Sequence, residues 1–291
     1  MFDVLSRSWE ITKMSFDVIK KDKELLLFPF FASIFSILFL IAMLVPSIIT
    51  SFIEEGVGPE AYGIVQYAVL FLTYLGLAFI ATFFNVCVVY TVKIRFEGGN
   101  ATFMESLKFA LSKIGLIFYW SLISATVGLV LRIIDILAEK AGPAGQFILG
   151  ILTMILGLMW SIITIFVVPA MVYHDLKPSD AIKKSVETLK KTWGESLVRY
   201  YGLGFIQAIL LIMGIFGGIL LLFVAQSLGL PYAMLGMIGI IVLYVILVML
   251  VFNVANGVFN TALYVYADTG SIPSGYSQDI MQNAFRKDKR R

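Results

Sequence analysis

Residues 25–50 read LLLFPFFASIFSILFLIAMLVPSIIT and contain no charged side chain. A helix needs about 20 apolar residues to cross the hydrocarbon core of a bilayer, so this stretch is long enough to span one. Five further stretches of the same kind follow along the chain. The sequence therefore predicts an all-α membrane protein with six transmembrane helices, at about residues 25–50, 63–92, 114–137, 145–173, 198–227 and 232–267.

The composition supports this fold class. The chain has 291 residues, of which 59% are hydrophobic, and its mean hydropathy is +0.92. Soluble domains are only about 45–50% apolar. Six spans leave no room for a second soluble domain, so residues 1–291 are expected to form one integral-membrane domain. The three connectors that follow the first, third and fifth spans are short, which predicts three helical hairpins.

The basic residues alternate from one connector to the next. Arg132 and Lys140 are the only two of the chain's 22 lysines and arginines that lie in the connectors inside the three hairpins. Basic residues resist translocation across the membrane, so segments rich in them stay in the cytoplasm. The pattern predicts a protein of the plasma membrane whose N and C termini are both cytoplasmic. The remaining basic residues fall within residues 7–23, 93–113, 177–199 and 286–291.

Three of these basic segments have helical periodicity of their own. Residues 1–22, 101–113 and 179–193 place apolar residues on one helical face and charges on others, and residues 269–291 form a basic tail. In the third segment the expected apolar face is Ile182, Val186, Leu189 and Trp193. Such helices either lie on the inner membrane surface or pack on the ends of the bundle. The first alternative predicts contacts with anionic lipid headgroups from Trp9, Lys183, Lys184, Lys190, Lys191 and Trp193.

Several amide side chains lie inside the predicted spans. Asn253, Asn256 and Asn260 occur at positions i, i+3 and i+7, which form one polar stripe on the sixth span. Asn85 and Gln207 lie at a comparable depth on the second and fifth spans. Polar groups in a membrane usually face protein or a cavity. These five amides are expected either to line a small polar cavity that opens to the cytoplasm or to form hydrogen bonds between helices.

The sequence offers little for catalysis. His174 is the only histidine, and no serine or cysteine stands beside it. Asp268 begins a DTG string, but aspartic protease chemistry needs two carboxylates and the string occurs once. Cys87 is the only cysteine, which excludes an internal disulfide and any cysteine-based metal site. We therefore expect no enzyme activity, no catalytic residue, no metal, no cofactor and no nucleic-acid partner.

Five segments also carry a resemblance to a known family. They occur in order over nearly the whole chain and resemble an uncharacterised prokaryotic integral-membrane family, a domain of unknown function. The resemblance implies six spans with cytoplasmic termini and no established substrate. In layout alone, the chain is also similar to the membrane domains that precede some glycerophosphodiester phosphodiesterases. The segments are SRSWEITKMSFDVIKKDKELLLFP (6–29), FFNVCVVYTVKIRFEGGNATFMESLKFA (83–110), VVPAMVYHDLKPSDAIKKS (167–185), LKKTWGESLV (189–198) and FNTALYVYADTG (259–270).

Two functions are consistent with these features. The first is a non-enzymatic membrane protein with a scaffold, lipid-interacting or membrane-assembly role, which uses its basic amphipathic helices at the cytoplasmic surface. The alternative is a transporter of a small solute or a lipid, which uses the asparagine-lined interior. No charged residue lies in the middle of a span to couple transport to an ion, and this favours the first function.

The predicted topology can be tested with single reporter fusions to the full-length chain. Fusions in the connectors that are poor in basic residues should be external, because few basic residues there resist translocation; they follow Pro59, Gly142 and Gly229. Fusions in the basic segments should be cytoplasmic; they follow Gly99, Pro178 and Arg291. A cytoplasmic signal from the fusion at Gly142 would contradict the six-span arrangement.

Overall fold

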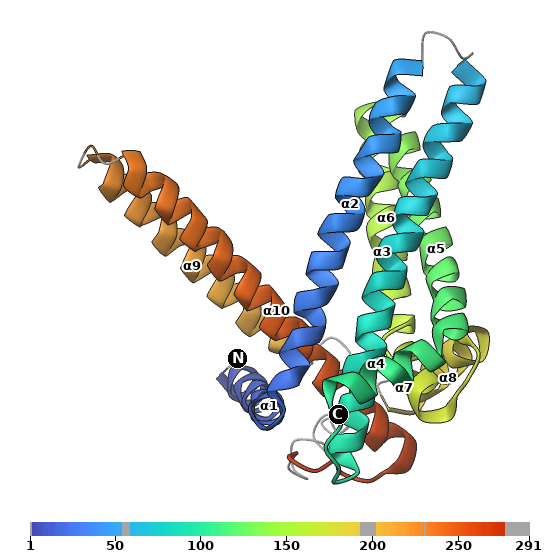
Figure 1. Cartoon of the computed structure of the whole chain (residues 1–291), viewed down its shortest axis with the longest axis vertical. Coiled ribbons are helices and arrows are strands. Elements are labelled where there is room, and N and C mark those ends of the chain that lie inside the picture. Colours follow the sequence, from blue (N-terminus) through green and yellow to red (C-terminus); the bar gives the residue numbers. More distant parts are fainter. Residues whose placement is uncertain (1, 54–58, 193–201, 228, 230, 277–291) are drawn as a thin grey trace.

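The structure of this protein is a computed structural model that describes residues 2–53, 59–192, 202–227, 229 and 231–276 (Figure 1). Every regular element in this part of the chain is helical, which confirms the predicted all-α fold class. The elements are α1 (Phe2–Lys21), η1 (Lys23–Leu26), α2 (Leu27–Ile53), α3 (Pro59–Phe96), α4 (Phe103–Ser112), α5 (Ile114–Lys140), α6 (Gly142–Ile163), α7 (Val167–His174), α8 (Pro178–Thr192), α9 (Gly202–Ser227) and α10 (Pro231–Thr269).

Six helical stretches of the described residues are long and apolar enough to cross a membrane, and each overlaps one predicted span. Their outward surfaces are apolar as well: Phe216 on α9 is 69% exposed and Phe223 is 68% exposed. Such surfaces suit hydrocarbon, because lipid tails are as apolar as these side chains. The six stretches are Lys23–Pro46, Gly63–Phe96, Ile114–Lys140, Gly142–His174, Leu203–Ser227 and Tyr232–Thr269.

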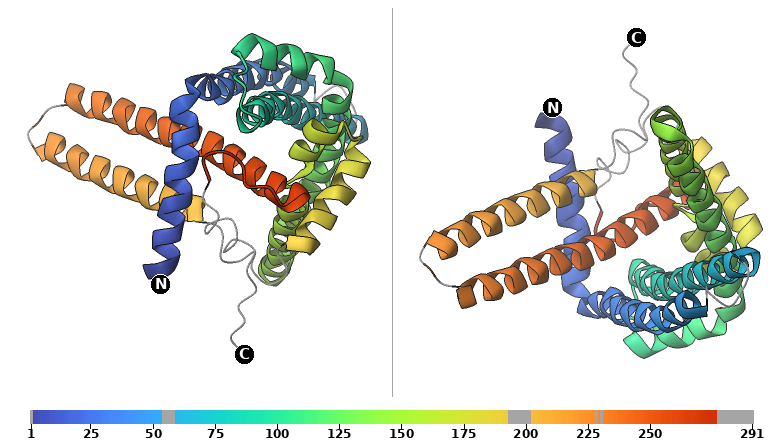
Figure 2. Two further views of the ribbon diagram at one scale, coloured as in Figure 1. Left: turned by 90° about the horizontal axis from the view of Figure 1, so that it is seen from below. Right: turned by 90° about the horizontal axis from the view of Figure 1, so that it is seen from above.

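The helices form two arms that diverge from one end of the molecule. Helices α2, α3, α5 and α6 make one arm, and the α9–α10 hairpin makes the other (Figure 1). The arms meet at the end that carries α1, α4, α7 and α8, which we call the basic end because Lys93, Arg95, Lys113 and Lys184 lie there. Figure 2 shows α1 crossing both α9 and α10 near this end.

The fourth predicted span is interrupted. The sequence predicts one span over residues 145–173, but α6 ends at Ile163 and α7 begins at Val167. The break is stabilised by Ser185 of α8, whose hydroxyl donates to the carbonyl of Ile163 at 2.5 Å and accepts from the N–H of Phe166 at 3.3 Å. One buried side chain thus satisfies two backbone groups that a continuous helix would have paired internally.

Ser185 lies on the side of α8 that faces the bundle. This side carries Ala181 and Ser185 at 0% exposure and Thr188 at 3%, together with Leu189. Of the predicted apolar face, Leu189 is thus buried, Ile182 and Val186 are half-buried, and Trp193 lies outside the described residues. Small residues suit this side because α8 packs closely on α7, where the serine must reach the backbone of the break.

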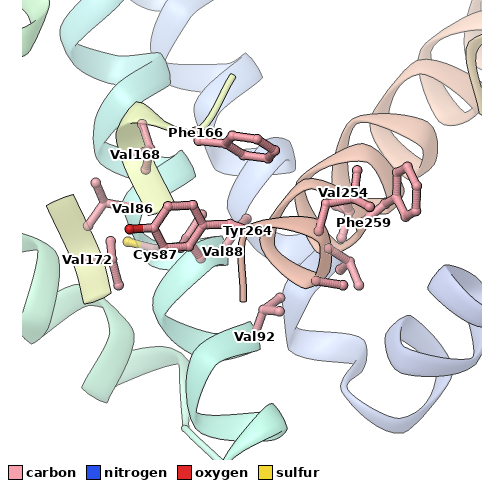
Figure 3. Packing of buried hydrophobic residues seen from close by; sticks show 14 of the residues in the cluster. Val86, Cys87, Val88, Val92, Phe166, Val168, Val172, Val254, Phe259 and Tyr264 are labelled. Atoms are coloured by element: carbon pink, nitrogen blue, oxygen red, sulfur yellow. The ribbon is translucent and has the colours of Figure 1, made fainter. Parts of the chain in front are cut away.

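Buried apolar side chains fill the basic end. Val86 and Val92 of α3, Phe166 beside α7, and Val254 and Tyr264 of α10 are all at most 1% exposed (Figure 3). These residues come from both arms of the molecule. Burial of each large apolar side chain contributes about 1.5–3 kcal/mol in water. The core therefore joins the two arms at the basic end.

Polar contacts tie the first helix to this core. The carboxylate of Asp22, which is 4% exposed, accepts hydrogen bonds from Nε and Nη2 of Arg95 at 3.1 and 2.9 Å. Glu24 accepts a hydrogen bond from the backbone N–H of Phe103 at the start of α4. Ser15 of α1 pairs with the hydroxyl of Tyr276 at 3.0 Å, and burial raises the pKa of that phenol above its ordinary value. The α1–α2 junction is thus fixed to α3, α4 and the segment after α10.

Helix α4 begins with a capping box, in which two side chains satisfy the first free N–H groups. The N–H of Glu105 donates to Oγ1 of Thr102 at 3.3 Å, and the N–H of Thr102 donates to Oε2 of Glu105 at 2.8 Å. The hydrogen bond from the Thr102 backbone lowers the pKa of Glu105. The spacing of Thr102 and Glu105 in the sequence TFME is typical of a capping box, and the structure forms one.

Glycines allow α9 and α10 to pack closely. A Cβ added at Gly214 would lie 1.9 Å from a ring carbon of Tyr244, and one at Gly218 would lie 2.5 Å from Cγ1 of Ile241. The Tyr244 hydroxyl donates to the carbonyl of Leu210 on α9 at 2.8 Å. The GxxxG pattern therefore serves packing within this hairpin.

We expect Gly214→Ala to destabilise the protein by about 1–3 kcal/mol, because the new methyl group overpacks the Tyr244 ring. Gly217→Ala is the matched control, since nothing lies within 4 Å of a Cβ at that position. The control should be neutral or stabilising by up to about 1 kcal/mol through helix propensity. Thermal denaturation of both full-length variants in detergent measures the difference. Equal stability of the two variants would contradict the packing argument.

Candidate functional site

A cavity of about 790 Å³ lies where the two arms meet. Helices α2, α3, α9 and α10 and the α6–α7 break all contribute to its wall. The wall residues are Pro29, Ala32, Ser33, Ser36, Ile37, Ala81, Phe84, Asn85, Val88, Val89, Ile165, Pro169, Gln207, Ile246, Met249, Leu250, Asn253, Asn256, Gly257 and Asn260.

All five amides named from the sequence line this cavity. Asn253, Asn256 and Asn260 share one face of α10 because a helix repeats every 3.6 residues. Asn85 lies on the neighbouring face of α3, and Gln207 lies in the second turn of α9. Three helices from both arms therefore direct amide-bearing faces toward one hollow.

None of the five amides forms a hydrogen bond to any residue that the structure describes. The alternative of interhelical amide hydrogen bonds is therefore not what this part of the chain shows. Each amide carries two donor hydrogens and an acceptor oxygen. An amide without partners costs about 2–7 kcal/mol where it is fully buried in an apolar environment; here Asn85 and Asn253 are exposed and the other three amides are half-buried, so only part of this cost applies. A ligand or ordered water in the cavity would remove this cost.

Two backbone features affect the wall of the cavity: a carbonyl without its helical donor and a close contact at a glycine. Pro169 has no N–H, so the carbonyl of Ile165, four residues earlier, lacks its usual helical donor, and both residues line the cavity. Gly257 lies at the closest approach of α10 to α3, where an added Cβ would be 3.2 Å from Cγ1 of Val88. A larger residue at position 257 would therefore narrow the cavity.

The wall of the cavity is not equally exposed at its two ends. Beyond Asn260, toward the basic end, Leu263 and Tyr264 are fully buried. At the opposite rim Ile37 is 57% exposed and Ile246 is 45% exposed. The exposed apolar rim of the cavity therefore lies on α2 and α10, which belong to different arms (Figure 1). An opening of the cavity toward the cytoplasm stays a prediction.

The predicted headgroup contacts fall into three groups. Lys184 forms an ion pair with Asp268 at 2.7 Å and is only 28% exposed, so its ammonium group already has a protein partner. Lys183, which pairs with Asp180 on the same helix at 3.3 Å, is 75% exposed. Lys190 is also exposed. For these two lysines, lipid contact stays a prediction. The side chains of Trp9, Lys191 and Trp193 lie outside the described residues.

One polar cluster at the basic end was missed by the sequence analysis. The carboxylate of Asp268 on α10 is 14% exposed, and it lies 2.8 Å from Nε2 of His174 on α7 and 2.7 Å from Nζ of Lys184 on α8. Sequence reasoning treated His174 and Asp268 as isolated because 94 positions separate them. Only the packing of α7 and α8 on α10 brings them together. Among the described residues, no group of three metal-binding side chains occurs.

Replacing Asp268 with asparagine should lower the free energy of unfolding by about 1–3 kcal/mol, because it removes a charged acceptor that serves two donors. Asp180→Asn is the matched control. Its ion pair with Lys183 is exposed, and exposed pairs contribute only about 0–1 kcal/mol. Thermal denaturation of the full-length variants gives the comparison. Equal losses in the two variants would show that Asp268 does not hold the three helices together.

The comparison with known families agrees with this fold. The chain matches the Family of unknown function (DUF6159) over residues 64–275, which is more than two thirds of its length. The match runs from α3 to the segment after α10 and includes all five amides and the Asp268 cluster. No curated protein matches the chain. The likeness in layout to phosphodiesterase membrane domains is not shown by these comparisons. This six-span helical membrane protein belongs to the DUF6159 family.

Proposed function

We propose that this protein is a non-enzymatic, multi-pass protein of the plasma membrane that binds a lipid in its amide-lined cavity. One observation carries the proposal. Five amides without hydrogen-bond partners among the described residues converge on one hollow at the junction of the two arms. Sites for small molecules have this form, a largely apolar wall with a few convergent polar groups and a volume of about 300–1,000 Å³.

The position of the exposed rim supports a lipid rather than a water-soluble solute. The rim residues Ile37, Ile246 and Met249 are about half exposed and apolar. A membrane lipid would reach this rim by lateral diffusion, whereas a soluble molecule would first have to cross hydrocarbon. The fully buried residues Leu263 and Tyr264 stand between the cavity and the basic end. This arrangement favours lipid binding over passage of a solute through the protein.

The distribution of basic residues predicts how the protein is oriented in the membrane. Basic segments remain in the cytoplasm, so the basic end and both termini would face inward. The cavity would then draw lipid from the inner leaflet. Lys183 and Lys190 would add contacts with anionic headgroups at that surface, each contributing about 1 kcal/mol of attraction. A scaffold or assembly role would use the same surface.

The proposal predicts that a lipid co-purifies with the full-length protein and depends on the amides. In Asn256→Leu, occupancy by that lipid should fall about tenfold, because one lost pair of amide hydrogen bonds is worth about 1.4 kcal/mol. Native mass spectrometry of protein purified in mild detergent measures the occupancy.

Thr126→Leu is the control for this experiment. Thr126 is exposed on α5, its hydroxyl donates to the carbonyl of Leu122 on the same helix, and it lies outside the cavity. The control should retain the lipid at the level of the unmodified protein. Equal lipid occupancy in Asn256→Leu and Thr126→Leu would exclude the cavity as the binding site.

A further inference from the structure

We infer that the cavity selects a lipid whose headgroup is uncharged and bears hydroxyl groups, such as a diacylglycerol or a glycosylated glycerolipid. The inference rests on the proposed function and adds the chemical class of the ligand. Three properties of the described wall support it. They are the charge of the wall, its balance of hydrogen-bond donors and acceptors, and the order of polar and apolar residues from the deep asparagines to the exposed rim.

The first property is charge. Every residue that lines the cavity is uncharged. The charged cluster at Asp268 is already paired, since this carboxylate contacts both Lys184 and His174. A phosphate headgroup placed among the amides would lose its hydration without gaining a cationic partner. Burial of an unpaired ion is far more costly than burial of a hydroxyl. The wall therefore disfavours anionic phospholipids.

The second property is the balance between donors and acceptors. Each amide presents an acceptor oxygen as well as two donor hydrogens. An ionised phosphate group is chiefly a hydrogen-bond acceptor, so most of these oxygens would stay unpaired beside it. A hydroxyl donates and accepts, so it can satisfy both halves of an amide. Several hydroxyls on one headgroup would match the five amides best.

The third property is the order of polar and apolar wall residues, from the deep asparagines to the exposed rim. Asn256 and Asn260 lie toward the closed basic end, whereas Ile246 and Met249 lie toward the open rim on the same helix. On α2, Ile37 occupies the rim opposite them. A lipid would therefore place its headgroup among the deep asparagines and its acyl chains along the apolar rim. This path leads from the cavity into the hydrocarbon between the arms.

The test compares lipids that share acyl chains and differ only in headgroup. Full-length protein in a neutral detergent is titrated with dioctanoylglycerol, its glucoside and dioctanoyl phosphatidic acid, and the melting temperature is followed. The glucoside and the diacylglycerol should raise the melting temperature saturably, and phosphatidic acid should bind at least about tenfold more weakly. In Asn256→Leu the shifts caused by the neutral lipids should be lost.

A second variant introduces the missing charge. Asn85 lies at the exposed part of the wall, so Asn85→Lys would offer a cation to a phosphate without filling the deep part of the cavity. This variant should bind phosphatidic acid about tenfold more tightly than the unmodified protein does. Thr126→Lys places the same charge outside the cavity and should leave the order of the three lipids unchanged.

The outcomes separate this inference from the proposed function. If phosphatidic acid binds as tightly as the glucoside and Asn256→Leu abolishes both, the cavity binds lipid but the neutral headgroup is wrong. If Asn85→Lys and Thr126→Lys raise the affinity for phosphatidic acid equally, the uncharged wall is not the reason that the cavity disfavours anionic lipids. If Asn256→Leu changes no lipid shift, the proposed function fails together with the inference.

Discussion

Hydrocarbon offers no hydrogen-bond partner to a polar group, and this constraint governs how the spans of this protein are built. Wherever the backbone ladder is interrupted, another group must supply the missing partner. At the α6–α7 break the partner is the Ser185 hydroxyl, which serves Ile163 and Phe166 at once. At Pro169 and at the five amides the described protein offers no such partner. The five amides gather around one cavity, and this concentration is the physical basis for the proposed ligand; two further unpaired hydroxyls, those of Tyr173 and Tyr264, lie outside its wall.

The junction of the arms is held mainly at the basic end. The buried pair of Asp22 with Arg95 fixes the α1–α2 corner to α3, and Asp268 connects α10 to α7 and α8. Around these contacts lies an apolar core drawn from α3, α7 and α10 (Figure 3). Because the arms diverge beyond this core, an opening is left between α2 and α10. The packed core at the basic end and the cavity beside it are therefore consequences of the same arrangement of helices.

The proposed lipid site combines features that neither arm has alone. The first arm contributes Asn85 and the apolar face of α2, and the second contributes Gln207 and the asparagine stripe of α10. A ligand that contacts both faces would stabilise one angle between the arms, because it binds only where the faces are close. Membrane lipids are present in large excess, so such a site would be occupied according to headgroup preference rather than to supply.

The sequence by itself determined the six apolar spans and the three hairpins, because these depend on composition and on the lengths of the connectors. It also determined the capping box at Thr102, which is a local pattern. The asparagine stripe could be read from the spacing of α10 alone. Only the tertiary structure decided that the amides of α3, α9 and α10 share one cavity, that its exposed rim lies on both arms, and that Asp268 meets His174 and Lys184. Those features depend on the angles between helices far apart in the chain, and such angles arise from packing that no single helix encodes.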